Sequence, residues 1–281
     1  MSDPLRTDRY ASRPIACITD RLAVQQTELP LQIAFRCFEC NGAVLADRPH
    51  AKFCSNACRQ RSHRRSKHDA AATITRGTNA DLIAEVAKLY ARPHHKIADL
   101  TYGKGVFWRQ TPQLDVTGSD LVTVPERPYD FRRLPYDTAS FDIAVLDPPY
   151  IHSPGQHQTD SRYQNAATTK GLDHDGIMQL YRDGMVEAKR IVRLGGQVWV
   201  KCKDQVASGV QRWDHIQLYL MAEALGLYAR DLFVLEPTAQ TSDARWEVQH
   251  HARKRHSYLW VFERLKVEEK GSALSLGMMR A

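Results

Sequence analysis

Apolar residues gather along this chain in short runs that are separated by amphipathic and polar stretches. The clearest run extends from Phe141 to Leu146 and is typical of a strand buried on both faces of a parallel sheet. Other strand-like runs cover residues 95–100, 114–119, 197–200, 228–235 and 256–262. The last of these alternates between polar and apolar positions, as expected of a strand with one buried face.

Apolar residues at helical spacing lie between those runs. Helices are expected from Asn79 or Asp81 to Tyr90, from Asp173 or Asp175 to the glycines at 195 and 196, at about 213–225, and directly after Gly105. Strands that alternate with helices in this way predict an α/β fold.

The tetrapeptide Asp147-Pro148-Pro149-Tyr150 directly follows the strand at 141–146. Open α/β sheets place their chemistry where parallel strands end. Two prolines stop the strand and stiffen the loop, so that a carboxylate, a carbonyl oxygen and an aromatic ring stand in fixed relation. Such a set suits the exocyclic amino group of a nucleobase, which needs hydrogen-bond acceptors and a ring to stack on. An ordinary turn is the alternative interpretation.

A glycine-rich turn, Asp99 to Gly105, lies upstream at the end of another strand-like run. Such a turn is tight and bare, as the approach of a cofactor to the backbone requires. Asp120 follows 21 residues after Asp99, a spacing that suits the ribose hydroxyls of an adenosine-bearing cofactor. The turn lacks a third glycine, which argues against a nicotinamide-dependent dehydrogenase.

Together these motifs resemble those of S-adenosylmethionine-dependent amino-methyltransferases that act on adenine N6 or cytosine N4 of DNA. The resemblance covers roughly residues 76–265 and implies a Rossmann-like class I methyltransferase sheet of seven strands, with one antiparallel strand added by the final hairpin. It implies S-adenosylmethionine as the cofactor. The cofactor-binding residues that it implies are Asp99, Thr101, Gly103 and Gly105 at the methionine end, Asp120 at the ribose, and Asp130 and Phe131 beside the adenine.

The segment between Asp120 and Asp130 departs from the family pattern, because it is too short for the usual helix and strand and contains two prolines. The resemblance assigns catalysis to Asp147, Pro148, Pro149 and Tyr150. Adenine-N6 members of that family usually carry Asp at the first position and cytosine-N4 members more often Ser, so the resemblance implies adenine. We expect this adenine to be flipped out of duplex DNA, stacked on Tyr150 and hydrogen-bonded through N6 to Asp147 and the Pro148 carbonyl. Asp147 follows Asp99 by only 48 residues, which leaves no room for a target-recognition domain between the two motifs. We therefore expect a short or loosely specified target sequence.

Four of the six cysteines, Cys37, Cys40, Cys54 and Cys58, have the spacing C-x2-C-x13-C-x3-C. This spacing suits tetrahedral zinc, and so small a segment has too few apolar residues to fold without a metal. Disulfides are the alternative, which a cytosolic chain disfavours. The stretch from Phe53 to Arg61 resembles short treble-clef-like zinc modules.

Basic residues concentrate in the same module. The chain carries a net charge of +7, and residues 36–68 hold eight Lys or Arg against Glu39 and Asp47. A helix that begins at Ser55 or Asn56 carries most of them, and we expect phosphate contacts there rather than a merely solvated face. A second basic segment precedes the last strand. The residues expected to bind nucleic acid are Arg59, Arg61, Arg64, Arg65, Arg253, Lys254 and Arg255.

Composition fits a cytoplasmic protein that does not associate with membranes, with 43% hydrophobic and 25% charged residues and no run of 18 apolar residues or leader. The polar stretch after Tyr150, up to Leu172, is expected to be a lid or substrate loop. The expected organisation is a flexible tail (1–35), a four-cysteine zinc module (36–68), a linker (69–75), a methyltransferase domain (76–265) and a C-terminal tail (266–281).

Three other functions remain open. The same chemistry serves RNA, at adenine N6 or guanine N2, and it serves cytosine N4 of DNA. A protein of another class, which binds DNA through zinc and keeps a vestigial methyltransferase fold, is the third. The intact Asp99, Gly103, Gly105, Asp147 and Tyr150 argue against the third function.

Overall fold

The computed structural model describes residues 33–46, 51–68, 70–149, 172–207, 209–238, 251–252 and 254–265. Residues from 32 onward belong to one compact unit. The segment expected to be a lid, apart from Leu172, lies outside the described residues, as do Tyr150, Arg253 and the two expected tails except for residues 33–35. Within the described residues, no helix is both long enough and apolar enough to span a membrane.

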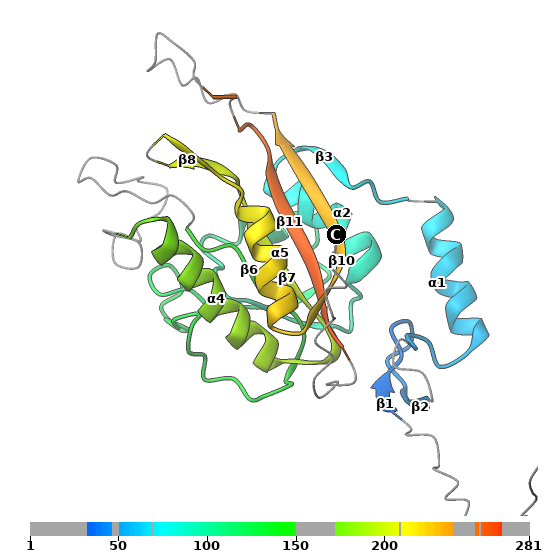
Figure 1. The fold of residues 1–281 in the computed structure, drawn as a ribbon. Helices are drawn as coiled ribbons and strands as arrows, with labels where there is room; N and C mark the ends of the chain where they lie inside the picture. The colour runs from blue at the N-terminus through cyan, green and yellow to red at the C-terminus, as the bar shows by residue number, and fades with distance from the viewer. Residues whose placement is uncertain are drawn as a thin grey trace, which may run out of the picture. The chain divides into compact units, whose positions relative to one another are not determined.

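A seven-stranded sheet forms the centre of the fold (Figure 1). Its strands, in order across the sheet, are β3 (Ile74–Gly77), β10 (Leu227–Pro237), β11 (Ser257–Arg264), β7 (Val192–Cys202), β6 (Phe141–Leu146), β4 (Lys96–Asp99) and β5 (Asp115–Gly118). Only β11 runs antiparallel to its neighbours. This arrangement confirms the predicted Rossmann-like class I methyltransferase fold. The order reverses between β4 and β6, the position at which such sheets hold ligands.

Helices cover both faces of the sheet, and each face has its own apolar core. On one face, α4 (His174–Ile191) and α5 (Asp214–Ala224) bury Tyr181 and Met185 against β6 and β7. On the other face, α2 (Asn79–Tyr90) packs Leu82, Ile83 and Val86 against the central strands. In Figure 1, α4 and α5 lie toward the viewer and α2 lies beyond the sheet. The central strands β4, β6 and β7 are therefore largely buried, which explains the apolar run in β6.

Two expected helices differ from the structure. The chain after Gly105 forms only one 3-10 turn, η1 (Val106–Trp108), because few residues remain before β5. Helix α4 ends at Ile191, not at the glycine pair. Gly195 and Gly196 lie inside β7, where the pairing with β6 shifts, and a Cβ on Gly196 would lie 2.6 Å from the carbonyl oxygen of Asp142. The glycines thus permit a bulge in the strand rather than a helix end.

The four-cysteine segment consists of a hairpin and a helix. The hairpin joins β1 (Ile33–Arg36) to β2 (Ala43–Ala46), and the helix is α1 (Asn56–His68). The hydroxyl of Ser55 accepts the amide N–H of Cys58, which caps the helix. A second small hairpin, β8 (Gln205–Ala207) with β9 (Val210–Arg212), follows β7 and lay outside the sequence expectations.

Candidate active site

Asp99 ends β4 and is almost fully buried, with 2% of its surface exposed. The indole N–H of Trp108 donates to its Oδ2 at 2.7 Å, and the amide of Thr101 donates to its Oδ1 at 3.1 Å. Burial raises the pKa of Asp99 to about 7, and the neighbouring carboxylates of Asp147 and Asp120 add to the rise. A cationic ligand at this edge would lower that pKa and stabilise the ionised form.

The turn after Asp99 depends on two glycines in the left-handed region, with φ values of 56° at Gly103 and 66° at Gly105. A Cβ on Gly105 would lie 2.6 Å from the hydroxyl oxygen of Tyr102. The ring of Tyr102 also occupies the space that a side chain on Gly118 would need. The sequence analysis did not predict that Tyr102 packs in this turn. Gly118 at the end of β5 was the available signal, because only a glycine there leaves space for the Tyr102 ring.

Asp120 joins the end of β5 to the glycine turn. Its Oδ1 accepts the amides of Val122 and Thr123, both at 2.9 Å, and its Oδ2 accepts the amide of Gly103 at 3.3 Å. A carboxylate offers about four acceptor positions, so one remains for a ligand hydroxyl. The structure therefore brings Asp99, Gly103 and Asp120 together at one edge of the sheet.

Asp130 and Phe131 lie in different surroundings. Arg132 forms a two-point ion pair with Asp130, with Nη2 to Oδ2 at 2.6 Å, and its hydrogen bonds hold the pKa of Asp130 down. Phe131 is buried beneath α4, where a Cβ on Gly184 would lie 2.9 Å from its ring. Within the part of the chain that the structure describes, no hydrogen bond links Asp130 to Asp120 or to the glycine turn. Their assignment to an adenine pocket stays a prediction.

Asp147 follows β6, and its amide donates to the hydroxyl of Thr101 at 2.8 Å. This bond ties the start of the Asp147–Pro149 segment to the glycine turn, so the two motifs that the sequence separates by 48 residues share one edge. Pro148 is buried and Pro149 is partly buried. Tyr150, expected to stack on the base, lies outside the described residues.

Lys201, near the end of β7, faces Asp147 and was missed by the sequence reasoning. Its ammonium lies 3.5 Å from each carboxylate oxygen of Asp147, and the two side chains are only 4% and 13% exposed. The hydroxyl of Tyr181 donates to the carbonyl of Lys201 at 2.9 Å and fixes the backbone there. The available signal was a lysine that interrupts the apolar run of β7.

Burial and Lys201 act on Asp147 in opposite directions. Burial raises the pKa of the carboxyl, and the charge and hydrogen bonds of Lys201 lower it. Burial is the larger effect, so the pKa of Asp147 lies above its ordinary value, and the ion pair with Lys201 offsets part of that rise in favour of the ionised carboxylate. Such a group accepts hydrogen bonds strongly and is suited to orient an amino group.

The sulfur atoms of Cys37, Cys40, Cys54 and Cys58 all lie within 4.8 Å of one another. All four cysteines are free thiols, with Cys40 to Cys54 at 3.7 Å and Cys54 to Cys58 at 3.4 Å between sulfurs. Tetrahedral zinc with Zn–S bonds of about 2.3 Å would set its sulfurs about 3.8 Å apart. Burial raises the pKa of Cys37, but amides of Cys40, Cys54 and Glu39 bond to its sulfur and bring that pKa to about 7. The donor set thus fits zinc.

The basic residues divide into two groups. Arg59, Arg61 and Arg64 are exposed along α1, as phosphate contacts require. The side chain of Arg65, like the whole of Arg253, lies outside the described residues. Near the last strand, the ammonium of Lys254 lies 4.6 Å from the centre of the Trp213 ring, and Arg255 is exposed. Exposure alone does not test whether these residues contact nucleic acid, so their role in binding stays a prediction.

No protein-family model matches this chain, and no curated protein matches it. Similar solved structures include a protein of Thermus thermophilus described as a DNA modification methylase (12% identity, TM-score 0.33, covering 60% of this chain and 53% of that one). A second is an S-adenosylmethionine-dependent methyltransferase of Methanosarcina mazei (12% identity, TM-score 0.41, covering 64% of this chain and 97% of that one). A third is the cytosine-N4-specific PvuII DNA methyltransferase (14% identity, TM-score 0.36, covering 47% of this chain and 45% of that one).

The chain thus spans about half the length of the first and third of these proteins. Identities and scores this low carry no argument about the site or its substrate.

Proposed function

We propose that this protein transfers a methyl group from S-adenosylmethionine to an exocyclic amino group of a nucleobase, with adenine N6 of DNA as the favoured target. The observation that carries the proposal is the hydrogen bond from the Asp147 amide to the Thr101 hydroxyl. It sets a carboxylate suited to an amino group beside a glycine turn suited to a cofactor. The switch point between β4 and β6 lies directly beneath both.

The residues at the glycine turn match the charge of the cofactor. Asp99 is a buried acid beside two other acids, and the cofactor carries a positive sulfonium and ammonium. Gly103 and Gly105 leave the backbone bare on that side, and Asp120 keeps one acceptor position for a ribose hydroxyl. When bound there, S-adenosylmethionine supplies an activated methyl group.

Asp147 and Lys201 provide the groups that act on the amino nitrogen. The Asp147 carboxylate and the Pro148 carbonyl accept the two N–H bonds of the base, with Tyr150 as the stacking ring. An amino nitrogen conjugated with the ring is a poor nucleophile, and these bonds favour the pyramidal form whose lone pair is free. Lys201 lies 3.5 Å from this carboxylate and favours its ionised, accepting form against the effect of burial, which raises the pKa of Asp147. Positioning and electrostatics carry the rate.

The four cysteines would hold one zinc ion, which orders the basic helix α1 for contact with the nucleic-acid backbone. Arg59, Arg61, Arg64 and Arg65 are the proposed phosphate contacts on that helix. Arg253, Lys254 and Arg255 are proposed as a second set of phosphate contacts.

Purified protein supplied with methyl-labelled S-adenosylmethionine tests this function. Label should enter DNA for the wild type and be lost for Asp147→Ala, whereas the exposed-acid control Asp115→Ala should keep it. Label found only in RNA, or only on cytosine N4, would keep the site and change the substrate. Absence of cofactor binding by the wild-type protein would contradict the proposal.

A further inference from the structure

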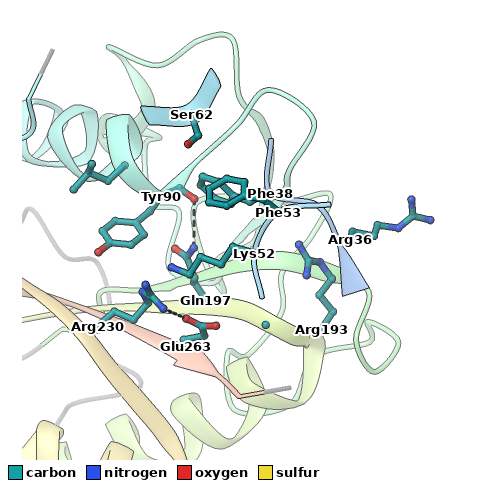
Figure 2. A pocket seen from close by; sticks show the side chains of 12 residues that line it. Arg36, Phe38, Lys52, Phe53, Ser62, Tyr90, Arg193, Gln197, Arg230 and Glu263 are labelled. Carbon is teal, nitrogen blue, oxygen red and sulfur yellow. Dashed lines mark hydrogen bonds and ion pairs between the residues drawn. The ribbon is translucent and has the colours of Figure 1, made fainter. Parts of the chain in front are cut away.

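A hollow of about 280 Å³ lies at the opposite end of the sheet from Asp99 and Asp147 (Figure 2). The four-cysteine segment contributes Phe38, Lys52 and Phe53 to one wall. The other wall comes from the start of β7, the early part of β10, the last turn of α2 and the far part of β11. Lys201 at the far end of β7 lies eight residues from Arg193, so the hollow is separate from the candidate active site.

Four cationic side chains and one acid line this hollow. The cations are Arg36, Lys52, Arg193 and Arg230, and the acid is Glu263. Two of the cations already have carboxylate partners: Arg193 pairs with Asp142 at 2.5 Å, and Arg230 pairs with Glu263. In the part of the chain that the structure describes, neither Lys52 nor Arg36 forms an ion pair with a carboxylate.

Lys52 is the central group. It is half-buried, and its carbonyl accepts the amide of Phe38 at 2.8 Å, which fixes the backbone. Figure 2 shows its side chain reaching from the four-cysteine segment toward Gln197 and the Arg230–Glu263 pair. The guanidinium of Arg36 lies further out, bonded to the carbonyl of Asn41. The carboxylates of Glu263 and Asp231 are close enough to favour the charged form of Lys52, but neither forms an ion pair with it. A half-buried cation without a paired anion is unusual, because desolvation disfavours the charge.

The chemistry of the lining favours a phosphate. An ammonium beside guanidinium groups with spare N–H donors is the usual composition of a phosphate site. The rings of Phe38, Phe53 and Tyr90 line the same hollow, and they offer apolar surface to a sugar or base attached to that phosphate. The volume is at the lower limit of ligand sites, which suits a single nucleotide.

We propose that this hollow binds one phosphate group, either of a free nucleotide or of a nucleic-acid backbone, with Lys52 as its principal cation. Arg193 and Arg230 donate their remaining N–H groups, and Arg36 stands at the rim. The site lies away from the reacting atoms and does not depend on methyl transfer by the Asp99–Asp147 edge.

Calorimetric titration of the full-length, metal-loaded protein tests the proposal with three probes: adenosine monophosphate, a dinucleoside monophosphate without a terminal phosphate, and adenosine. At least one phosphate-bearing probe should bind, and adenosine should bind at least tenfold more weakly. Preference for the first probe identifies a free nucleotide, and preference for the second identifies a backbone phosphate. Adenosine that binds as well as both phosphates, or no binding by either phosphate, would overturn the proposal.

Variants localise the site. Lys52→Met should lower the affinity for the phosphate-bearing probe about tenfold or more, and Lys52→Arg should retain most of the wild-type affinity. Arg36→Gln should lower the affinity by a smaller factor. Lys96→Met is the matched control, because it removes an exposed lysine outside the hollow and should leave binding unchanged. Zinc content and S-adenosylmethionine affinity report on folding of each variant. Wild-type phosphate affinity in both folded Lys52→Met and Arg36→Gln would also overturn the proposal.

Discussion

The candidate active site and the four-cysteine segment are held in place by different forces. The residues of the candidate active site stand at the ends of strands that contribute many buried side chains to two apolar cores, and hydrogen bonds join the loops above them. In the four-cysteine segment, by contrast, few described residues are buried, among them Phe35, Cys37 and Cys58. So small an apolar core contributes little stability, and the proposed zinc ion on the four converging sulfurs would take its place.

This difference predicts that the two regions fail independently. Loss of one side chain at the strand ends should stop the chemistry without unfolding the sheet. Loss of the metal should disorder the segment without emptying the cofactor site. Contacts between the four-cysteine segment and the sheet domain include Arg92, which lies over the Phe38 ring at 4.3 Å, with its Nε 3.8 Å from Glu39 and its Nη2 3.4 Å from the Ser62 hydroxyl.

The largest effect is expected for Asp147→Ala. Removal of the acceptor should lower methyl transfer by about 100-fold or more, because the amino group loses its orienting partner. Cofactor affinity should remain, since Asp99 and Asp120 are intact. Turnover and cofactor binding, measured on the same preparation, check this. Equal loss of both would show that the carboxylates are wrongly assigned.

Cys58→Ser, or removal of zinc by a chelator, should affect the other region. Amide hydrogen exchange should become fast in residues 33–46 and 51–68 and stay slow in the buried strands β6 and β7. Nucleic-acid binding should weaken while cofactor affinity stays nearly unchanged. Cys202→Ala is the matched control, because that free cysteine is buried in the sheet. Protection lost throughout the sheet of the Cys58 variant would mean that the regions do not fail separately.

Lys201→Met tests whether Lys201 offsets the effect of burial on the Asp147 carboxyl in the candidate active site. The charge of Lys201 lowers the pKa of Asp147 against the effect of burial, so its loss should raise that pKa further. The acid limb of the pH–rate profile should then move to higher pH, with the loss of turnover largest at low pH and smallest above neutrality. A uniform loss at every pH would assign Lys201 a structural role only.

The smallest expected effect is the change in cofactor affinity with pH, which near neutrality should be smaller than the losses of turnover expected for the variants above. The pKa of Asp99 is about 7 in the folded protein and about 4 in the unfolded chain. Because the unfolded chain loses this proton first, the free energy of unfolding decreases as the pH rises from about 4 to about 7. A cationic cofactor selects the ionised form. Its affinity should rise as pH increases toward 7 and level off above, and Asp99→Asn should remove this dependence. Constant wild-type affinity from pH 5 to 8 would contradict the assignment.

Features that depend on a short stretch of sequence could be predicted, and features that depend on contacts between distant segments could not. The buried strand β6, the tetrapeptide after it and the cysteine spacing are local patterns, and the structure has the strand and the sulfur cluster where the sequence placed them. Lys201 and Tyr102 depend on contacts between distant segments, which no local pattern reveals. Strand β3, at the end of the expected linker, forms because β10 offers a free edge more than 150 residues later.

The glycine pair illustrates a second limit. Two glycines after a helical stretch usually end a helix, but Gly195 and Gly196 fit a bulge that only the pairing of β7 with β6 requires.

Nucleoside analysis of genomic DNA from a methylase-deficient bacterial host that expresses this protein tests the central claim most directly. The account predicts N6-methyladenine with the wild-type protein and none with Asp147→Ala. An unmethylated genome, from a wild-type protein that binds S-adenosylmethionine and is present at the level of an active control methylase, would contradict the claim that this edge of the sheet methylates DNA. The same result for the wild type and Asp147→Ala, with N6-methyladenine in both, would contradict the catalytic role of that carboxylate.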